Sequence, residues 1–404
     1  MSGSYIIDGC RLPVGSFGGS LANARPDDML AHVIKHLVAE YPQIPAERYA
    51  DVIAGCANQA GEDNRNIARM SSLLAGLPFT VPGETVNRLC ASGMSAVINA
   101  HRSILAGDGD VILAGGVENM SRGPLVVSKS STPFGRDHQM YDSSFGWRFI
   151  NPQMEKMYGV DSMGMTAENV AEKYNISGSE QNDYALASQM KAAESQRNGR
   201  LAKEIIPIEV RKSRKETISF EADEFIKSDS TLEKLTKLKP AFKEGGTVTA
   251  GNASGLNDGA ACLLVASQHA VDQYELEPLA RIISSGRSGV EPRIMGIGPV
   301  SASNIALKKA GLSIDDIGII EMNEAFAVQV LACLKELGIS MSDKRLNPNG
   351  GSIAIGHPLG MSGSRILLSA ALELRLTGQK YALVTMCVGL GQGYAVVLEN
   401  CADN

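Results

Sequence analysis

Aromatic residues, histidines and clustered charges are all scarce in this chain of 404 residues. Phe, Trp and Tyr make up 5% of it, six residues are His, and 38 basic residues are interleaved with 44 acidic ones for a net charge of -6. A nucleic-acid-binding protein normally needs a clustered basic surface. No apolar run approaches the length of a membrane span, and the N-terminus lacks a basic region followed by a signal core. We therefore expect a cytoplasmic protein that binds neither nucleic acid nor a membrane.

The seven cysteines lack the spacing of a disulfide framework or of a zinc site. Their number is odd, and no pair has Cys-x-x-Cys spacing. His32 and His36 have the i, i+4 spacing of metal ligands on a helix, but no third ligand accompanies them. Reduced thiols and no metal site are the expectation.

What the chain does contain is the composition of a compact α/β protein, with 44% hydrophobic residues, 20% charged residues and 42 Gly. Strand-like and helix-like segments alternate in both halves, which predicts a mostly parallel sheet covered on both faces. The expected strands are 5–7, 51–55, 111–116, 318–321 and 381–386. The expected helices are 27–39, 66–75, 90–105, 166–198, 303–310, 323–337 and one that opens at 357.

Two stretches far apart in the chain read like one design used twice. Cys90 and His357 each lie three residues before a Gly-Met-Ser triplet, and each opens an Ala/Ile/Leu-rich helical run. Asp51 begins a strand 39 positions before Cys90, and Gly318 begins one 39 positions before His357. Equal spacing to a matched strand favours internal duplication over chance. A duplicated fold would bring Cys90 and His357 face to face across its pseudo-symmetry axis.

Cys90 is the strongest candidate for a nucleophile. A cysteine in the first turn of a helix lies near the positive end of the helix dipole and near free N–H groups, both of which favour thiolate. The alternative is a packed core cysteine. The matched His357 decides against it, because a Cys–His pair is the general recipe for an activated thiol.

Two further candidates follow apolar strands. Cys387 enters the run Gly389-x-Gly391-x-Gly393, which lacks the long helix and the downstream acidic residue of a dinucleotide loop. A tight turn that exposes a thiol beside free N–H groups fits better, and it suits proton transfer and oxyanion binding. Asn323 either caps a helix or faces the ligand crevice at the end of its strand.

Six ordered motifs together resemble the thiolases (acetyl-CoA acyltransferases) and cover essentially the whole chain. They are residues 87–94 (NRLCASGM), 115–121 (GGVENMS), 246–260 (GTVTAGNASGLNDGA), 323–327 (NEAFA), 347–360 (NPNGGSIAIGHPLG) and 387–393 (CVGLGQG). The resemblance implies an α/β fold in which two βαβαβ-type halves form a five-layered α-β-α-β-α sandwich. We expect the N-terminal half to comprise residues 1–120 and 247–270, and the C-terminal half residues 271–404. Residues 121–246 are expected to form an inserted cap lobe, used either for ligand binding or for oligomerisation.

The resemblance also implies a role for each site residue. His357 would take the proton of Cys90, whose thiolate would attack the 3-keto carbonyl of a 3-oxoacyl-CoA. Cys387 would protonate the departing acetyl-CoA enolate, and the acyl group on Cys90 would pass to free CoA. His357 and a water held by Asn323 would bind the enolate oxygen, and the N–H groups of Cys90 and Gly389 the tetrahedral oxygen. CoA is then a co-substrate, and no metal or bound cofactor is expected.

Five positions are expected to contact CoA. Ser254, Ala250, Met163 and Phe326 match family positions that line the pantetheine tunnel. Lys227 matches a spot near the adenine nucleotide where related enzymes often have Arg, although a solvated surface lysine would have the same sequence.

The expected substrate follows from the cap lobe. Residues 141–152 and 158–163 resemble the 3-oxoadipyl-CoA thiolases of aromatic degradation, whose substrate bears a terminal carboxylate. Arg148 either pairs with that group or is structural. Residues 163–169 also resemble acetoacetyl-CoA thiolases, and Ala91 stands where the oxoadipyl group more often has Gly. We expect 3-oxoadipyl-CoA or a related 3-oxoacyl-CoA, with condensation of two acetyl-CoA as the alternative, and a homotetramer as in the family.

Two other classes of protein resemble thiolases. Decarboxylating condensing enzymes of the ketosynthase type share the duplicated fold, but they generally lack a second cysteine at the position of Cys387. A thiolase-like lipid carrier or scaffold would be expected to lose Cys90 or His357. This chain keeps all three residues.

Overall fold

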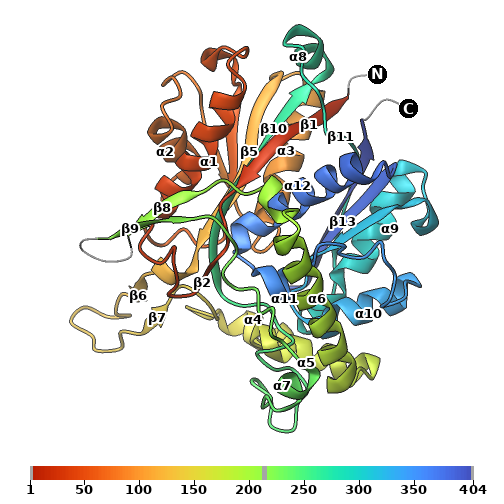
Figure 1. Cartoon of the computed structure of the whole chain (residues 1–404). Coiled ribbons are helices and arrows are strands. Elements are labelled where there is room, and N and C mark those ends of the chain that lie inside the picture. Colours follow the sequence, from red (N-terminus) through yellow and green to blue (C-terminus); the bar gives the residue numbers. More distant parts are fainter. Residues whose placement is uncertain (1–2, 212–215, 402–404) are drawn as a thin grey trace.

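The structure is a computed structural model that describes residues 3–211 and 216–401 (Figure 1). Its centre is a ten-stranded sheet in which the two halves of the chain meet where β1 pairs with β11. The strands of the N-terminal half are β1 (Ser4–Arg11), β2 (Gly15–Ser16), β3 (Asp51–Gly55), β4 (Glu84–Val86), β5 (Val111–Asn119) and β10 (Asn257–Ser267). Those of the C-terminal half are β11 (Ala280–Gly289), β12 (Ile319–Met322), β13 (Tyr381–Val388) and β14 (Gln392–Asn400).

The strand order shows the duplication directly. Outward from β1 the order is β1-β10-β5-β3-β4, and outward from β11 it is β11-β14-β13-β12. An isolated parallel bridge between Ile320 and Leu346 takes the place that β4 has beside β3. β1, β10, β5 and β3 therefore occupy the same places in the N-terminal half as β11, β14, β13 and β12 do in the C-terminal half, as the matched spacing predicts.

The prediction of a mostly parallel sheet is wrong. Pairing is parallel only at the outer edges, where β3 pairs with β4 and β5 and where β12 pairs with β13. The central strands β1, β10, β11 and β14 pair with their neighbours in antiparallel fashion. The short turn after Cys387 forces this for β13 and β14, since strands joined by a tight turn run antiparallel.

Helices form three layers around the two halves of the sheet. Their apolar faces separate into distinct clusters of buried residues, one outside each half and one between the halves. The outer layer of the N-terminal half holds α1 (Pro26–Glu40) and α2 (Ile67–Leu74), and that of the C-terminal half holds α9 (Gly298–Ala310) and α10 (Ala327–Leu337). Between the halves lie α3 (Ser92–Ala106) and α12 (Leu359–Thr377). The result is the predicted α-β-α-β-α arrangement.

The segment between β5 and β10 forms several small elements that gather mainly at one end of the molecule (bottom of Figure 1). They are β6 (Leu125–Val127), β7 (Met140–Asp142), α4 (Pro152–Tyr158), α5 (Met163–Tyr174), α6 (Gly178–Arg197), β8 (Ile208–Arg211), β9 (Thr217–Phe220) and α7 (Leu232–Thr236). The single helix predicted over 166–198 is two helices, because the chain turns at Asn175 with a φ of 52°. Two short helices elsewhere are α8 (Gln268–Gln273) and α11 (Ser352–Ile355).

Buried charges tie the inserted segment to the sheet. Arg11 of β1 forms ion pairs with Glu204 at 2.8 Å and with Asp223 at 2.7 Å, and the three side chains are fully buried. Val170 of α5 and Tyr184 of α6 also pack into the apolar cluster outside the C-terminal half. No helix in residues 3–211 or 216–401 is long and apolar enough to cross a membrane.

Candidate active site

Cys90, His357 and Asn323 lie in connections that precede helices, and not in the helices themselves. The predicted helix starts at these residues are therefore too early, because α3 begins at Ser92, α12 at Leu359 and α10 at Ala327. Sharp turns come before two of them. Leu89 has a φ of 47° and Gly356 a φ of 111°, so the chain reverses just before Cys90 and just before His357. Their side chains consequently emerge at the ends of α3 and α12.

The Gly-Met-Ser triplets mark the place where α3 and α12 cross. A Cβ atom on Gly93 would lie 2.5 Å from the carbonyl oxygen of Gly360, and one on Gly363 would lie 2.4 Å from the backbone nitrogen of Met94. Only glycine lets the two backbones approach so closely. Cys90 lies three residues before Gly93 and His357 three residues before Gly360, so the two catalytic candidates occupy equivalent places beside the crossing.

Gly93→Ala is expected to destabilise the protein by about 1–3 kcal/mol, because the added methyl group meets backbone atoms that no rotamer change can move aside. The melting temperature and the turnover rate should both fall. Gly178→Ala is the matched control, since Gly178 also lies in the first turn of a helix but its Cβ would have no neighbour closer than 3.7 Å. Equal stability of the two variants would contradict a tight crossing at Gly93.

Hydrogen bonds fix the tautomer of the buried His357 imidazole. Its Nδ1 lies 2.6 Å from Ser362 Oγ, and the Ser362 hydroxyl donates to the carbonyl oxygen of Pro358 at 2.8 Å. A hydroxyl has one proton, so Nδ1 must donate to Ser362 and Nε2 keeps a free lone pair. Asn257 accepts the backbone N–H of His357 at 2.9 Å, and the Asn323 amide nitrogen lies 3.4 Å from Nε2. Nε2 is therefore the atom able to act as a base.

Burial sets the resting charge of the pair. It raises the pKa of Cys90 to about 11, although hydrogen bonds from the backbone N–H groups of Gly389 and of Cys90 itself favour the thiolate. Burial and the nearby Arg365 cation lower the pKa of His357 to about 3. Desolvation therefore outweighs the N–H groups, which favour the thiolate. At neutral pH the site holds a thiol beside a neutral base.

The two N–H groups that act on Cys90 are the predicted oxyanion donors. Gly389 follows β13, in the turn where Leu390 and Gly391 both have positive φ. That turn aims the Gly389 N–H at the Cys90 sulfur, where the N–H of Cys90 itself also points. Donors placed there can stabilise negative charge on an oxygen attached to the carbon that the sulfur attacks.

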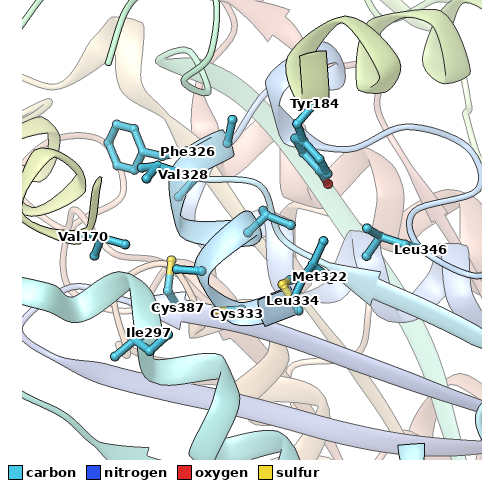
Figure 2. Packing of buried hydrophobic residues seen from close by; sticks show 14 of the residues in the cluster. Val170, Tyr184, Ile297, Met322, Phe326, Val328, Cys333, Leu334, Leu346 and Cys387 are labelled. Atoms are coloured by element: carbon cyan, nitrogen blue, oxygen red, sulfur yellow. The ribbon is translucent and has the colours of Figure 1, made fainter. Parts of the chain in front are cut away.

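Cys387 is buried in the apolar cluster outside the C-terminal half (Figure 2). It lies close enough to Cys90 for the two thiols to interact. Burial raises its thiol pKa well above the ordinary value, and interaction with Cys90 raises it further. Cys387 therefore stays protonated at neutral pH and can donate a proton. Such a group could protonate a carbanion formed next to Cys90.

Glu118 is the residue that sequence reasoning missed, and it is the structural counterpart of Cys387. Val52 pairs with Leu113 in the N-terminal half, just as Ile319 pairs with Ala382 in the C-terminal half. Glu118 and Cys387 each lie five residues further along their strands, and each faces a glycine of the next strand. Burial raises the pKa of Glu118 to about 7.

Glu118 joins the two halves of the site. Its carboxylate accepts hydrogen bonds from the N–H groups of Ala57 at 3.0 Å, Asn58 at 2.9 Å and Gly360 at 2.8 Å. Ligand atoms of Glu118, Cys56 and Asp63 lie within 4.8 Å of one another, a grouping that could hold a metal ion. Because the Glu118 oxygens already accept these three N–H groups, the carboxylate is better explained as an anchor for the start of α12.

Four of the five residues expected to contact CoA lie around one side of this site. Ser254 donates from its N–H and its hydroxyl to the carbonyl oxygen of Ala325, at 3.0 and 3.1 Å, and the preceding residue bridges to Phe326. The Met163 sulfur lies 4.0 Å from where a Cβ on Gly389 would be. The ammonium group of Lys227 lies 5.3 Å from the centre of the Phe225 ring, which packs on the residue after Ser254.

Ala250, the fifth of these residues, is exposed in the connection that leads to Ser254. It makes no contact that links it to Cys90 in the described part of the chain.

Arg148 lies on the other side, against the loop that follows β3. Its guanidinium donates to the carbonyl oxygen of Ser143 at 3.0 Å and lies 3.4 Å from the Asn58 side-chain oxygen. Asn58 is the residue whose N–H binds Glu118. No carboxylate pairs with Arg148 in residues 3–211 and 216–401, so this half-buried cation has only neutral partners there.

Comparisons with known proteins agree with this geometry. The N-terminal domain of thiolase matches residues 4–269, and the C-terminal domain of thiolase matches residues 276–400. A 3-oxoadipyl-CoA/3-oxo-5,6-dehydrosuberyl-CoA thiolase of Escherichia coli K12 is 51% identical over 99% of this chain and 100% of that protein. An acetyl-CoA acetyltransferase of Chromobacterium violaceum is 45% identical over 98% of both chains.

The fold agrees as well. The crystal structure of human mitochondrial 3-ketoacyl-CoA thiolase superposes with a TM-score of 0.91, at 40% identity and over 99% of each chain. The predicted fold and the resemblance noted from the motifs are thereby confirmed. The chain belongs to the thiolase family and is an acyltransferase.

Proposed function

We propose that this thiolase cleaves 3-oxoadipyl-CoA with free CoA to give succinyl-CoA and acetyl-CoA. Arg148 is the observation that carries the choice of substrate. It is a half-buried cation whose described partners are neutral oxygens, and it lies against the loop whose N–H groups bind Glu118. A terminal carboxylate on the acyl chain would supply the missing anion. The relative from Escherichia coli, named for 3-oxoadipyl-CoA, supports the same substrate.

The first half of the reaction forms the acyl-enzyme. His357 Nε2 takes the proton of Cys90, and the thiolate attacks C3 of the substrate while the N–H groups of Cys90 and Gly389 bind the carbonyl oxygen. The C2–C3 bond then breaks and leaves a succinyl thioester on Cys90. Protonated His357 and a water on the Asn323 amide hold the enolate oxygen of acetyl-CoA. Cys387 donates the proton that completes acetyl-CoA.

The second half regenerates the thiol. Protonated His357 first passes its proton to the Cys387 thiolate, which restores both the neutral base and the Cys387 thiol. CoA then enters past Ala250 and along the side formed by Ser254, Met163, Phe326 and Lys227, and His357 takes the proton of its thiol. The CoA thiolate attacks the Cys90 thioester, Cys90 leaves as a thiolate and takes that proton from His357, and succinyl-CoA departs. We propose that no metal and no bound cofactor takes part, because imidazole and N–H groups supply the proton transfer and the charge stabilisation.

Arg148→Gln is expected to lower kcat/KM for 3-oxoadipyl-CoA about 10- to 100-fold, since a charge-assisted hydrogen bond to the substrate is lost. The rate with acetoacetyl-CoA, which has no terminal carboxylate, should stay within about twofold of the original enzyme. The measurement is a thiolysis assay that compares the two substrates and a medium-chain 3-oxoacyl-CoA. Lys156→Gln is the control, because it removes an exposed positive charge from the same insertion.

An equal loss on both substrates would show that Arg148 is structural. If the unmodified enzyme prefers acetoacetyl-CoA, the alternative assignment holds, namely condensation of two acetyl-CoA. The 45% identity to the acetyl-CoA acetyltransferase of Chromobacterium violaceum is the reason to include acetoacetyl-CoA in the assay.

We further propose that the protein acts in the cytoplasm as a homotetramer, a dimer of dimers. The β6–β7 hairpin supports self-association because it exposes large apolar side chains, among them Leu125, Phe134 and Met140. An exposed apolar group of this kind is typical of a surface that another chain covers. Light scattering of the purified protein measures the number of subunits.

A further inference from the structure

Arg365 of α12 is a buried cation that the reaction described above does not use. Its side chain is 1% exposed and lies close enough to His357 to affect its protonation. One Nη2–H donates to Ser352 Oγ at 3.3 Å. The Nε–H has no hydrogen-bond partner, and no ion pair holds the guanidinium within the described ranges 3–211 and 216–401. A buried charge with so few partners is costly, which calls for a reason at this place.

The bond to Ser352 begins a chain of hydrogen bonds whose direction is fixed. A guanidinium can only donate, so Ser352 Oγ accepts from Arg365 and must send its one proton elsewhere. That proton goes to Asn323 Oδ1, 2.7 Å away. Because Oδ1 faces Ser352, the amide nitrogen of Asn323 is the atom that faces His357 Nε2.

The far end of the same chain can only accept. The Nδ1–H of His357 donates to Ser362, and Ser362 donates to the carbonyl oxygen of Pro358. Every member between Arg365 and that carbonyl therefore has one allowed orientation. The residues involved are Ser352, Asn323, His357 and Ser362, and each is at most 4% exposed.

We propose that Arg365 is a positioning residue that fixes the orientation of the Asn323 amide and, through it, the basic tautomer of His357. If the amide flips, its oxygen faces Nε2 and accepts a proton from it. The flipped state therefore stabilises the Nε2–H tautomer, which cannot take the proton of Cys90. The inference rests on the thiolase reaction but not on the choice of 3-oxoadipyl-CoA as substrate.

The charge of Arg365 has a second effect on His357. The charged groups that face Arg365 come from three other parts of the chain. Glu321 lies on β12, Arg11 on β1, and Glu204 and Asp223 in the inserted segment. Among the charged groups of the described residues, Arg365 is the one that acts on the protonation of His357, and its positive charge disfavours imidazolium. Removal of the cation should raise the pKa of His357, so activity should be lost at a higher pH as the solution is acidified.

Three variants separate these effects, assayed with the substrate that the unmodified enzyme turns over fastest. Ser352→Ala removes the link and keeps the cation, so kcat for thiolysis should fall on the order of tenfold while the acid limb of the pH profile stays in place. Arg365→Met removes both, so kcat should fall and the acid limb should move to higher pH. Arg365→Lys keeps the charge and should hold the acid limb near its original position.

Ser369→Ala is the matched control, because Ser369 is a buried serine of the same helix whose hydroxyl binds Glu204 and does not touch the chain to His357. It should keep the original kcat. Melting temperatures of all four variants show which of them fold. If Ser352→Ala folds and retains full kcat, the hydrogen-bond chain does not position Asn323 and the proposal fails. It also fails if Arg365→Met loses stability alone, with kcat and pH profile unchanged. An unmodified enzyme without thiolysis activity would instead overturn the proposed function.

Discussion

Cys90→Ser should reduce the rate of thiolysis by about three orders of magnitude or more and abolish the acyl-enzyme. A serine hydroxyl is a far weaker acid than a thiol, so transfer of its proton to the neutral His357 is much less favourable than transfer from Cys90. The substitution replaces sulfur by oxygen at nearly constant shape, so the fold should persist. Intact-protein mass spectrometry after mixing with a 3-oxoacyl-CoA in the absence of CoA measures the acyl adduct directly.

Cys401→Ser is the control for this variant, because Cys401 is also a partly buried free cysteine and lies at the end of the chain beyond β14. It should acylate like the original enzyme. Unchanged turnover of Cys90→Ser would remove Cys90 from the nucleophile's role, and an adduct that persists in this variant would locate the nucleophile at another residue.

The duplication could be predicted from the sequence because the two halves have the same spacing between matching motifs. A strand start, a nucleophile or base, and a Gly-Met-Ser triplet recur at equal intervals, and the mirrored strand order of the sheet follows from them. Strand direction was not predictable in the same way. A buried strand such as β10 is apolar along its whole length whether its neighbours run parallel or antiparallel, so the pattern carries no sign of orientation.

The residues that orient the catalytic groups could not be predicted from the sequence, because their role depends on hydrogen-bond geometry. Asn323 or His357 is held through single polar atoms of Ser352, Ser362 and Asn257. Serine and asparagine are common in loops, so their presence in the sequence does not show that they orient a catalytic group. Ser362 was the one with a visible signal, since it ends the triplet after His357. The resting protonation state of Cys90 could not be predicted for a related reason. The sequence shows which residue precedes a helix, but not how much the fold desolvates its side chain.

The register of the sheet places Cys387 inside the repeat. It occupies in β13 the place that Glu118 occupies in β5. Glu118 binds Gly360 at the start of α12, and Cys387 lies near Cys90, just before α3. One half thus uses this place for a carboxylate that accepts N–H groups, and the other for a protonated thiol. The two halves therefore place residues of different function at equivalent positions. Because a glutamate and a cysteine share no sequence pattern, the repeated motifs alone did not reveal that Glu118 and Cys387 correspond.

Cys387→Ala should separate proton transfer from acyl transfer, because the thiol at this position donates the proton and Cys90 carries the acyl group. Exchange of the α-protons of acetyl-CoA with deuterated solvent should fall by about 10²- to 10⁴-fold, the usual contribution of a positioned acid or base. Acetylation of Cys90 by acetyl-CoA should survive in part, since that step needs His357 and the N–H groups of Cys90 and Gly389 but no proton at C2. Proton exchange is followed by mass spectrometry of acetyl-CoA, and acetylation by mass spectrometry of the protein.

Cys333→Ala controls for the loss of a buried thiol, because Cys333 of α10 belongs to the same apolar cluster as Cys387 (Figure 2). Its thiol donates a hydrogen bond to the carbonyl oxygen of Gly296. Both variants remove a sulfur atom from the same core, so their melting temperatures should fall by similar amounts. A difference between them in α-proton exchange therefore reports chemistry and not packing. If Cys387→Ala loses acetylation as completely as it loses exchange, the two steps share this thiol, and the division of roles between the matched positions is wrong.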